Sequence, residues 1–262
     1  MIRSLTTAAT GMVVQQRNLD VIANNLANIN TTAFKANRAE FQDLMYQTLR
    51  VAGAEQGGGT LVPAAQQVGM GAKFVSSATN FAPGPLQATS SQLDIAINGG
   101  GFFGVTLPDG TIAYTRDGSF KMSADGLIVT SDGFALVGDI TVPLESQLIT
   151  ISANGTVTAQ VAGQVDPQVL GQMNVYMFPN AGGLERMGKN LYLNTAASGD
   201  ATETEPGLSG SGFLEQGFLE GANVQMVEEM VRMILAQRAY EVNSKAIQTA
   251  DEMLSSTNNL KR

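Results

Sequence analysis

The sequence predicts an α+β protein in which long helices at both ends of the chain flank an antiparallel all-β domain. Three observations predict this fold class. All eight prolines lie between residues 63 and 206, glycine occurs once in the first 52 residues, and neither occurs after Gly221. Apolar residues recur every seven positions near both ends. Four Asp-Gly pairs follow one another in the middle of the chain at spacings of eight, eight and seven residues.

The first 52 residues are expected to begin with a helix, because helix interiors exclude proline and glycine. Its apolar positions repeat with the period of a helix-pairing seam. The repeat consists of Leu5, Met12, Leu19 and Leu26, with Ala8 and Ile22 at the intermediate positions. We expect this helix to end near residues 28–32, where the sequence Asn-Ile-Asn-Thr-Thr is rich in turn-forming residues.

A second helix is predicted from Ala222 to about Ser255. Its seven-residue repeat consists of Met226, Met233, Tyr240, Ile247 and Leu254, and Val227, Val231, Ile234 and Leu235 widen the apolar face. The two helices can pair as a coiled-coil-like unit, but a stripe this broad stays partly exposed, which is typical of an interface. From the pattern alone, the alternative of two ordinary core helices in an α+β fold remains open.

The middle of the chain is expected to form short strands joined by tight turns. Asp-Gly is a strong signal for a two-residue hairpin turn, and the pairs begin at Asp109, Asp117, Asp125 and Asp132. The strand-like runs between and after them are residues 112–115, 127–130, 134–137, 148–151 and 173–178. Short strands with regular turns predict an antiparallel sheet, sandwich or barrel.

These patterns divide the chain into four parts. Residues 1–35 are expected to form the N-terminal helical part and residues 36–70 an extended connector. Residues 71–220 are expected to form the antiparallel β domain, and residues 221–262 the C-terminal helical part.

Composition argues against most catalytic and binding chemistries. The chain has no His and no Cys, which removes the commonest general base near neutral pH and the usual transition-metal ligands. We predict no catalytic residue, cofactor or metal site. The Asp-Gly pairs lack the ligand spacing of a calcium loop, and Gly99-Gly100-Gly101 lacks the following helix of a phosphate loop, so a tight turn or bulge is expected there.

The charge and the hydropathy of the chain limit its partners. The net charge is −8 and no basic patch stands out, so no nucleic acid is expected. No run of 18 apolar residues occurs, so no membrane insertion is expected. The N-terminus lacks the pattern of a secretory signal peptide, so we expect either a cytoplasmic protein or export without a cleaved signal peptide.

The stretch from Leu19 to Lys35, LDVIANNLANINTTAFK, resembles the N-terminal signature of the bacterial flagellar axial proteins, which include rod, hook and hook-associated subunits. The C-terminal stretch from Leu219, LEGANVQMVEEMVRMILAQRAYEVNSKAIQTADEML, is similar to the other signature of that family. One departure is Ala33, where the family usually has glycine. If a left-handed backbone is needed there, alanine has a steric cost.

Within the family, the chain is most similar to the distal-rod members of the basal body. The similar stretches are MIRSLTTAATGM, AEFQDLMYQTLR, LDIAINGGGFF and YTRDGSFKMSADGLIVTSDGFALVG. Residues 46–68 match the place where distal-rod members carry a segment that hook protein lacks, and in the family that segment is linked to a straight, stiff rod.

The resemblance implies a structural subunit, not an enzyme, that polymerises through its terminal helices into a tubular drive shaft and transmits torque from motor to hook. It implies as partners other copies of the chain, neighbouring rod and hook subunits, the surrounding peptidoglycan and outer-membrane ring, and the type III export apparatus. The implied location is the periplasm-spanning rod of the flagellar basal body, in a bacterium with flagellar motility. The expected assembly residues are Leu5, Met12, Leu19, Ile22, Asn24, Asn25, Leu26, Asn28, Met226, Val231, Met233, Tyr240, Ile247 and Leu254.

Two alternatives remain. The chain could be another axial subunit, from the proximal rod or the hook. From a different class, it could be a periplasmic β-domain enzyme or a calcium-binding protein.

Overall fold

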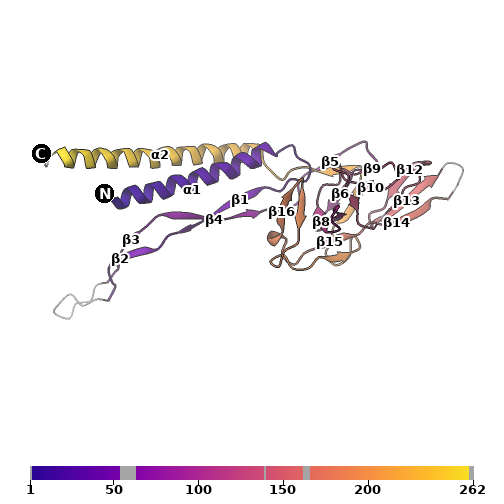
Figure 1. Cartoon of the computed structure of the whole chain (residues 1–262), viewed down its shortest axis with the longest axis horizontal. Coiled ribbons are helices and arrows are strands. Elements are labelled where there is room, and N and C mark those ends of the chain that lie inside the picture. Colours follow the sequence, from indigo (N-terminus) through magenta and orange to yellow (C-terminus); the bar gives the residue numbers. More distant parts are fainter. Residues whose placement is uncertain (1, 54–62, 139, 162–165, 260–262) are drawn as a thin grey trace. The chain divides into compact units, whose positions relative to one another are not determined.

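The computed structural model describes residues 2–53, 63–138, 140–161 and 166–259. It has one long helix at each end of the chain and β structure between them, so the α+β prediction is confirmed (Figure 1). The chain forms two compact units. One, the helical unit, holds residues 1–27, 37–78 and 225–262, and the other, the β unit, holds residues 28–36 and 79–224.

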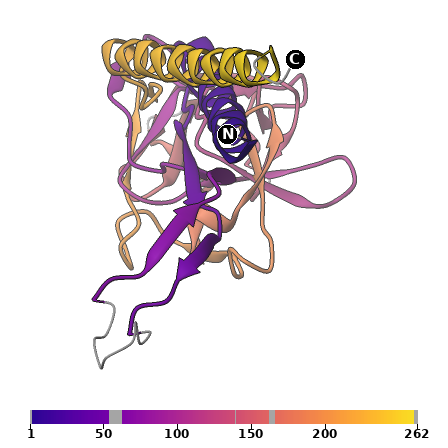
Figure 2. The ribbon, with the colours of Figure 1, turned by 90° about the vertical axis from the view of Figure 1, so that its left-hand side faces the viewer.

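The helical unit contains α1 (Ile2–Ala27), α2 (Met226–Asn259) and four strands. The strands form two ribbons, in which β1 pairs with β4 and β2 pairs antiparallel with β3. Their bounds are β1 Asn37–Asp43, β2 Tyr46–Arg50, β3 Gln66–Gly69 and β4 Ala72–Thr79. Helix α1 contacts both α2 and β1, and both views place it between α2 and the ribbon (Figures 1 and 2). Within this unit, the far side of α2 is therefore left uncovered.

The β unit is built around a seven-stranded antiparallel sheet in the order β16-β17-β8-β7-β11-β10-β9. A three-stranded sheet, β12-β13-β14, and the pairs β15-β18, β19-β6 and β20-β5 accompany it. The seven strands are β7 Phe103–Thr106, β8 Ile112–Thr115, β9 Lys121–Met122, β10 Ile128–Val129, β11 Ala135–Leu136, β16 Glu185–Gly188 and β17 Leu191–Leu193. The remaining elements are β5 Leu86–Ala88, β6 Ile95–Asn98, β12 Ser146–Ile151, β13 Thr156–Val161, β14 Gln168–Gln172, β15 Val175–Met177, β18 Thr202–Thr204, β19 Phe213–Gln216, β20 Phe218–Glu220 and the short 3-10 helix Ala181–Gly183.

The main core of the β unit lies among these sheets. Ile95, Phe103, Val157 and Met173 are completely buried there. Burial of side chains of this size stabilises a fold by roughly 1.5–3 kcal/mol each.

Three of the four Asp-Gly pairs form the predicted turns. Those at Asp109, Asp125 and Asp132 connect β7 to β8, β9 to β10 and β10 to β11. The prediction was wrong for Asp117-Gly118, which lies in extended chain after β8. Ile95 donates its N–H to the carbonyl of Gly118 at 3.1 Å, and a Cβ atom on Gly118 would collide with the carbonyl oxygen of Ile95. Glycine is needed there for close packing of two backbones, not for a turn.

The helix ends follow from local contacts. Helix α1 ends at Ala27 and residues 28–32 form turns, as predicted. Helix α2 begins at Met226, four residues later than predicted, and Glu229 donates the first helical hydrogen bond to the carbonyl of Gln225 at 3.0 Å. The start is delayed because Ala222 and Val224 are buried in a cluster with Phe34, in extended chain.

The unit boundaries differ from the four parts expected from the sequence. Residues 28–36 belong to the β unit, in which Ala33, Phe34 and Lys35 are buried. Residues 37–78 belong to the helical unit, because β1 contacts α1, and their described part forms two pairs of strands. Part of the expected rod-specific segment, residues 54–62, lies outside the described residues. No helix among the described residues has the length and apolar character needed to cross a membrane.

Candidate assembly surface

The two faces of α2 differ in what they present. On the inner face, which packs on α1, Ala236 and Ala250 are buried. The other face carries large apolar side chains that are between 50% and 76% exposed. This outer patch consists of Met226, Val227, Met230, Val231, Ile234 and Leu235.

The outer patch belongs to the first part of α2 only. Beyond Leu235 many exposed positions are polar or charged, including Arg238, Glu241, Lys245 and Gln248. The exposed large apolar side chains there are Tyr240, Val242 and Met253, which are widely spaced. Beside the patch, Arg232 pairs with Glu228 at 2.6 Å and with Glu229 at 3.1 Å. A contiguous exposed apolar patch bordered by charged groups is typical of an interaction surface.

The predicted assembly residues fall into three groups. Ile22 and Asn25 are buried within the helical unit. The partly buried group consists of Leu5, Met12, Leu19, Leu26, Asn28, Met233, Ile247 and Leu254. The exposed group consists of Asn24, Met226, Val231 and Tyr240. The seven-residue repeat therefore mostly follows the inner faces of the helices, and the residues that widen the stripe of α2 form the exposed surface.

Asn25 has a structural role inside the helical unit. Its Oδ1 accepts a hydrogen bond from the N–H of Asn37 at 2.9 Å, and its Nδ2 donates to the carbonyl oxygen of Asn37 at 2.8 Å. The side chain is 1% exposed. Asn25 thus fixes the start of β1 against the end of α1.

The ribbons also expose apolar side chains. Phe41, Tyr46, Leu49 and Val75 are exposed. The rings of Phe41 and Phe74 pack edge to face, with centroids 6.1 Å apart, but this contact does not cover Phe41. The helical unit therefore carries exposed apolar groups on both α2 and the ribbons.

The segment Ala33–Lys35, the end of the N-terminal signature stretch, is buried in the β unit. Ala33 has a left-handed backbone, with φ of 55°, and donates its N–H to the carbonyl of Glu220 at 2.7 Å. Phe34 packs on Ala222 and Val224. The left-handed conformation considered in the sequence analysis is therefore present, and alanine adopts it at some steric cost.

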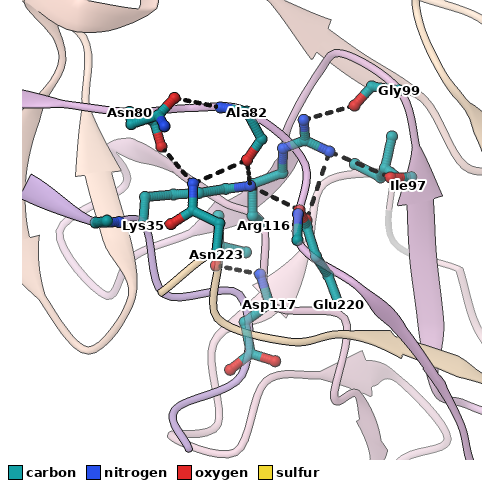
Figure 3. Close-up of polar contacts among 12 residues, drawn as sticks. Lys35, Asn80, Ala82, Ile97, Gly99, Arg116, Asp117, Glu220 and Asn223 are labelled. Atoms are coloured by element: carbon teal, nitrogen blue, oxygen red, sulfur yellow. Dashed lines mark hydrogen bonds and ion pairs between the residues drawn. The ribbon is translucent and has the colours of Figure 1, made fainter. Parts of the chain in front are cut away.

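Lys35 belongs to a buried cluster of charges (Figure 3). Its Nζ donates to Glu220 Oε1 at 2.6 Å and to the carbonyl of Ala82 at 2.9 Å. Arg116 lies 3.7 Å from the other oxygen of Glu220 and donates to the carbonyls of Ile97 and Gly99. All three charged side chains are at most 3% exposed. Burial lowers the pKa of Lys35 from its ordinary value, while Glu220 opposes that shift.

Two further side chains hold the same segment. Asn223 accepts a hydrogen bond from the N–H of Ala36 and donates to the carbonyls of Asn80 and Ala82. Arg186 donates to the carbonyl of Lys35 at 2.6 Å, and its guanidinium lies over the ring of Phe34. The sequence indicated Phe34 and Lys35 only as signature residues. Nothing in the local pattern indicated their partners, which are far away in the sequence.

No group of three or more metal-ligating side chains is found among the described residues. A small polar pocket in the β unit is lined in part by Asp117, Asp132 and Lys189. Lys189 lies 3.5 Å from Asp132, so these charges neutralise each other. Gly99 and Gly101 have positive φ, and Gly100 forms an isolated parallel β-bridge with Ser211 in the irregular chain between β6 and β7.

Three family models match the chain. They are described as flagella basal body rod protein, matching residues 5–35, flagellar hook protein FlgE/F/G D1 domain, matching residues 96–159, and flagellar basal body rod FlgEFG protein C-terminal, matching residues 215–260. The first match includes Ala33–Lys35, and the third includes Glu220 and the outer patch.

Full-length relatives agree with these models. The flagellar basal-body rod protein FlgG of Borreliella burgdorferi is 50% identical over 264 residues, covering 100% of both chains. That of Buchnera aphidicola subsp. Acyrthosiphon pisum is 49% identical, covering 97% of this chain and 98% of the relative. That of Caulobacter vibrioides is 48% identical, covering 99% of both.

A fold with an exposed apolar helix face, in which residues 5–35, 96–159 and 215–260 match rod and hook domains, defines a structural subunit and not an enzyme. The chain belongs to the family of flagellar basal-body rod proteins.

Proposed function

We propose that this chain forms the distal rod of the flagellar basal body and polymerises through its terminal helices into a straight tube that transmits torque from motor to hook. The observation that carries the proposal is the outer patch of α2. Six large apolar side chains remain exposed in the subunit. Covering them in a polymer would stabilise each contact by roughly 1 kcal/mol per half-exposed side chain.

The proposed assembly surface includes only some of the residues in the seven-residue repeats. Met226 and Val231 lie in the outer patch and are available for contacts between subunits. Ile22 and Asn25 stabilise the helical unit of the single subunit, and they do not contact neighbouring subunits directly. We propose that α1 and α2 pair in a coiled-coil-like manner along their inner faces. The remaining predicted residues are proposed to contribute both to this pairing and to contacts between subunits.

The ribbons are proposed to contribute to a straight, stiff rod. Their exposed apolar residues, such as Tyr46 and Leu49, give each subunit a second surface to cover during assembly. A subunit held at two separated surfaces bends less than one held at a single surface. This feature favours the distal rod over the alternative of a hook subunit, because residues 46–68 match the rod-specific segment.

Within such a polymer, the proposed partners are other copies of the chain, adjacent rod and hook subunits, and the surrounding ring. We propose that the β units face outward and that the subunit reaches the periplasm through the type III export apparatus. The proximal rod is the second candidate within the family, and a relative described as rod protein FlgF, 33% identical over 258 residues, keeps it open.

The experiment is to replace the wild-type gene with the variant Ile234→Asp and isolate basal bodies. An aspartate in the patch places a charge at a contact that must lose water, so rods are expected to be missing or short and motility lost. Gln248→Asp, at an exposed polar position of the same helix, is the matched control and is expected to leave rods normal. Normal rods with Ile234→Asp, from a stable subunit, would contradict the proposal.

A further inference from the structure

The buried charge cluster brings together parts of the β unit that are far apart in the chain. Lys35 and Glu220 are separated by 185 residues, yet their side chains are 2.6 Å apart and fully buried. Arg116 comes from the chain after β8. Figure 3 shows Lys35 and Arg116 both directed toward Glu220.

The charges in this cluster are unequal. Lys35 and Arg116 are two cations, and Glu220 is the carboxylate that both of them approach. A buried charge without a partner is much more costly than a buried pair. Loss of Glu220 therefore leaves two buried cations without a counter-charge, whereas loss of Lys35 leaves the pair of Arg116 and Glu220.

The chain from Glu220 to Asn223 also provides further contacts of residues 33–36. The carbonyl of Glu220 accepts the N–H of Ala33, and Asn223 accepts the N–H of Ala36. Glu220 Oε1 further accepts the N–H of Gly84 at 2.8 Å. Residues 33–36 therefore depend on residues 220–223 for both charge balance and backbone hydrogen bonds.

We propose that Glu220 is a completion lock for the β unit. Residues 33–36 close into the unit only when the strand β20 has docked, and until then this part of the chain stays open. The segments that lead out of α1 and into α2 are thereby joined in one late step, after nearly the whole chain is present. The inference goes beyond assembly, because it rests only on contacts within one subunit.

The test is hydrogen exchange on the full-length purified protein, comparing wild type with Glu220→Ala. We expect the amides of Ala33 and Ala36 to exchange roughly tenfold faster or more in the variant, because local opening becomes easier. Trypsin is expected to cleave after Lys35, which is buried in the wild type. Amides of the core strand pair β7–β8 are expected to keep their protection.

Glu215→Ala is the matched control. Glu215 lies on β19 and accepts a hydrogen bond from Asn98 at the surface, so its loss is expected to leave residues 33–36 closed. If Glu220→Ala unfolds the whole unit, Glu220→Gln replaces it, since glutamine keeps the size and an acceptor for Gly84. Exchange at Ala33 and Ala36 that stays at the wild-type rate in the Glu220 variant overturns the proposal.

Lys35→Met separates a lock based on Glu220 from a simple ion pair. With this variant, Arg116 and Glu220 still balance each other, so residues 33–36 are expected to open less than with Glu220→Gln. Equal or greater opening with Lys35→Met would overturn the assignment of the lock to Glu220.

Discussion

The side-chain amide of Asn25 binds both backbone groups of Asn37, which lies twelve residues later. It accepts from the N–H at 2.9 Å and donates to the carbonyl at 2.8 Å. The amide binds the N–H and the carbonyl of the first residue of β1 in the way that the backbone of a neighbouring strand would. The end of α1 and the start of the ribbon are therefore one structural unit, although the chain between them enters the β unit.

Asn25→Ala is expected to destabilise the helical unit by about 2 kcal/mol, because two part-buried hydrogen bonds to the backbone of Asn37 are lost. Urea unfolding followed by circular dichroism measures this loss. Gln16→Ala, at an exposed position of the same helix, is the control and is expected to change stability by less than about 0.5 kcal/mol. Equal stability of both variants would show that the two bonds are not needed.

Ala33 offers a test of backbone strain. Ala33→Gly removes a left-handed cost of about 1–2 kcal/mol, but it also loses a buried methyl group and raises the entropy of the unfolded chain. These effects nearly cancel, so stability is expected to change by less than about 1 kcal/mol. Ala33→Val is expected to destabilise by more than about 2 kcal/mol, because a β-branched residue fits poorly at positive φ. Thermal unfolding of both variants measures these changes in stability. A valine variant as stable as wild type would contradict the prediction.

The sequence predicted the regular elements better than the long-range contacts. The helices, three Asp-Gly turns and the strand at residues 112–115 follow from periodicity and turn chemistry, which are local. The partners of Lys35 could not be found in this way, because Arg116 and Glu220 approach it only in the folded β unit. Asp117-Gly118 has the same local pattern as the other pairs, and only the nearby backbone of Ile95 distinguishes it.

The same limit applies to the candidate assembly surface. Periodicity placed Met226 and Val231 on an apolar stripe, and both are exposed. It grouped them with Met233 and Ile247, which are partly buried. A seven-residue repeat identifies apolar positions, but only the packing of α1 on α2 decides which of them are covered.

Alkaline pH is expected to destabilise the β unit partly through Tyr176. Burial, with a further effect of Glu203, raises the pKa of Tyr176 from 10.0 to about 12. Since the pKa is higher in the folded state, the stability from this group is complete below pH 10 and is lost as the pH rises toward 12.

Tyr176→Phe is therefore expected to lose less stability than wild type between pH 9 and pH 11, as measured by urea unfolding. The lowered pKa of Lys35 acts in the opposite direction, but it is common to both proteins and cancels in the comparison. If the free energy of unfolding of the variant and of wild type changed equally with pH, a raised pKa at Tyr176 would be contradicted.

The exposed ribbon residues are expected to matter for the rod and not for the subunit. The double variant Tyr46→Ser and Leu49→Ser changes side chains that are about half exposed, so the free energy of unfolding should change by less than about 1 kcal/mol. Rods seen by electron microscopy are expected to be fewer or curved. Straight rods in normal number would show that the ribbon is not part of the assembly surface.

Assembly through the outer patch of α2 is tested most directly by photo-crosslinking from this patch in living cells. A benzophenone amino acid at Leu235 is expected to give an adduct at twice the subunit mass, with mass spectrometry identifying a peptide from a second copy of the chain. The same probe at Gln248 is expected to give much less of this adduct. Absence of the self-adduct at Leu235, in cells that build rods, would contradict assembly through this patch.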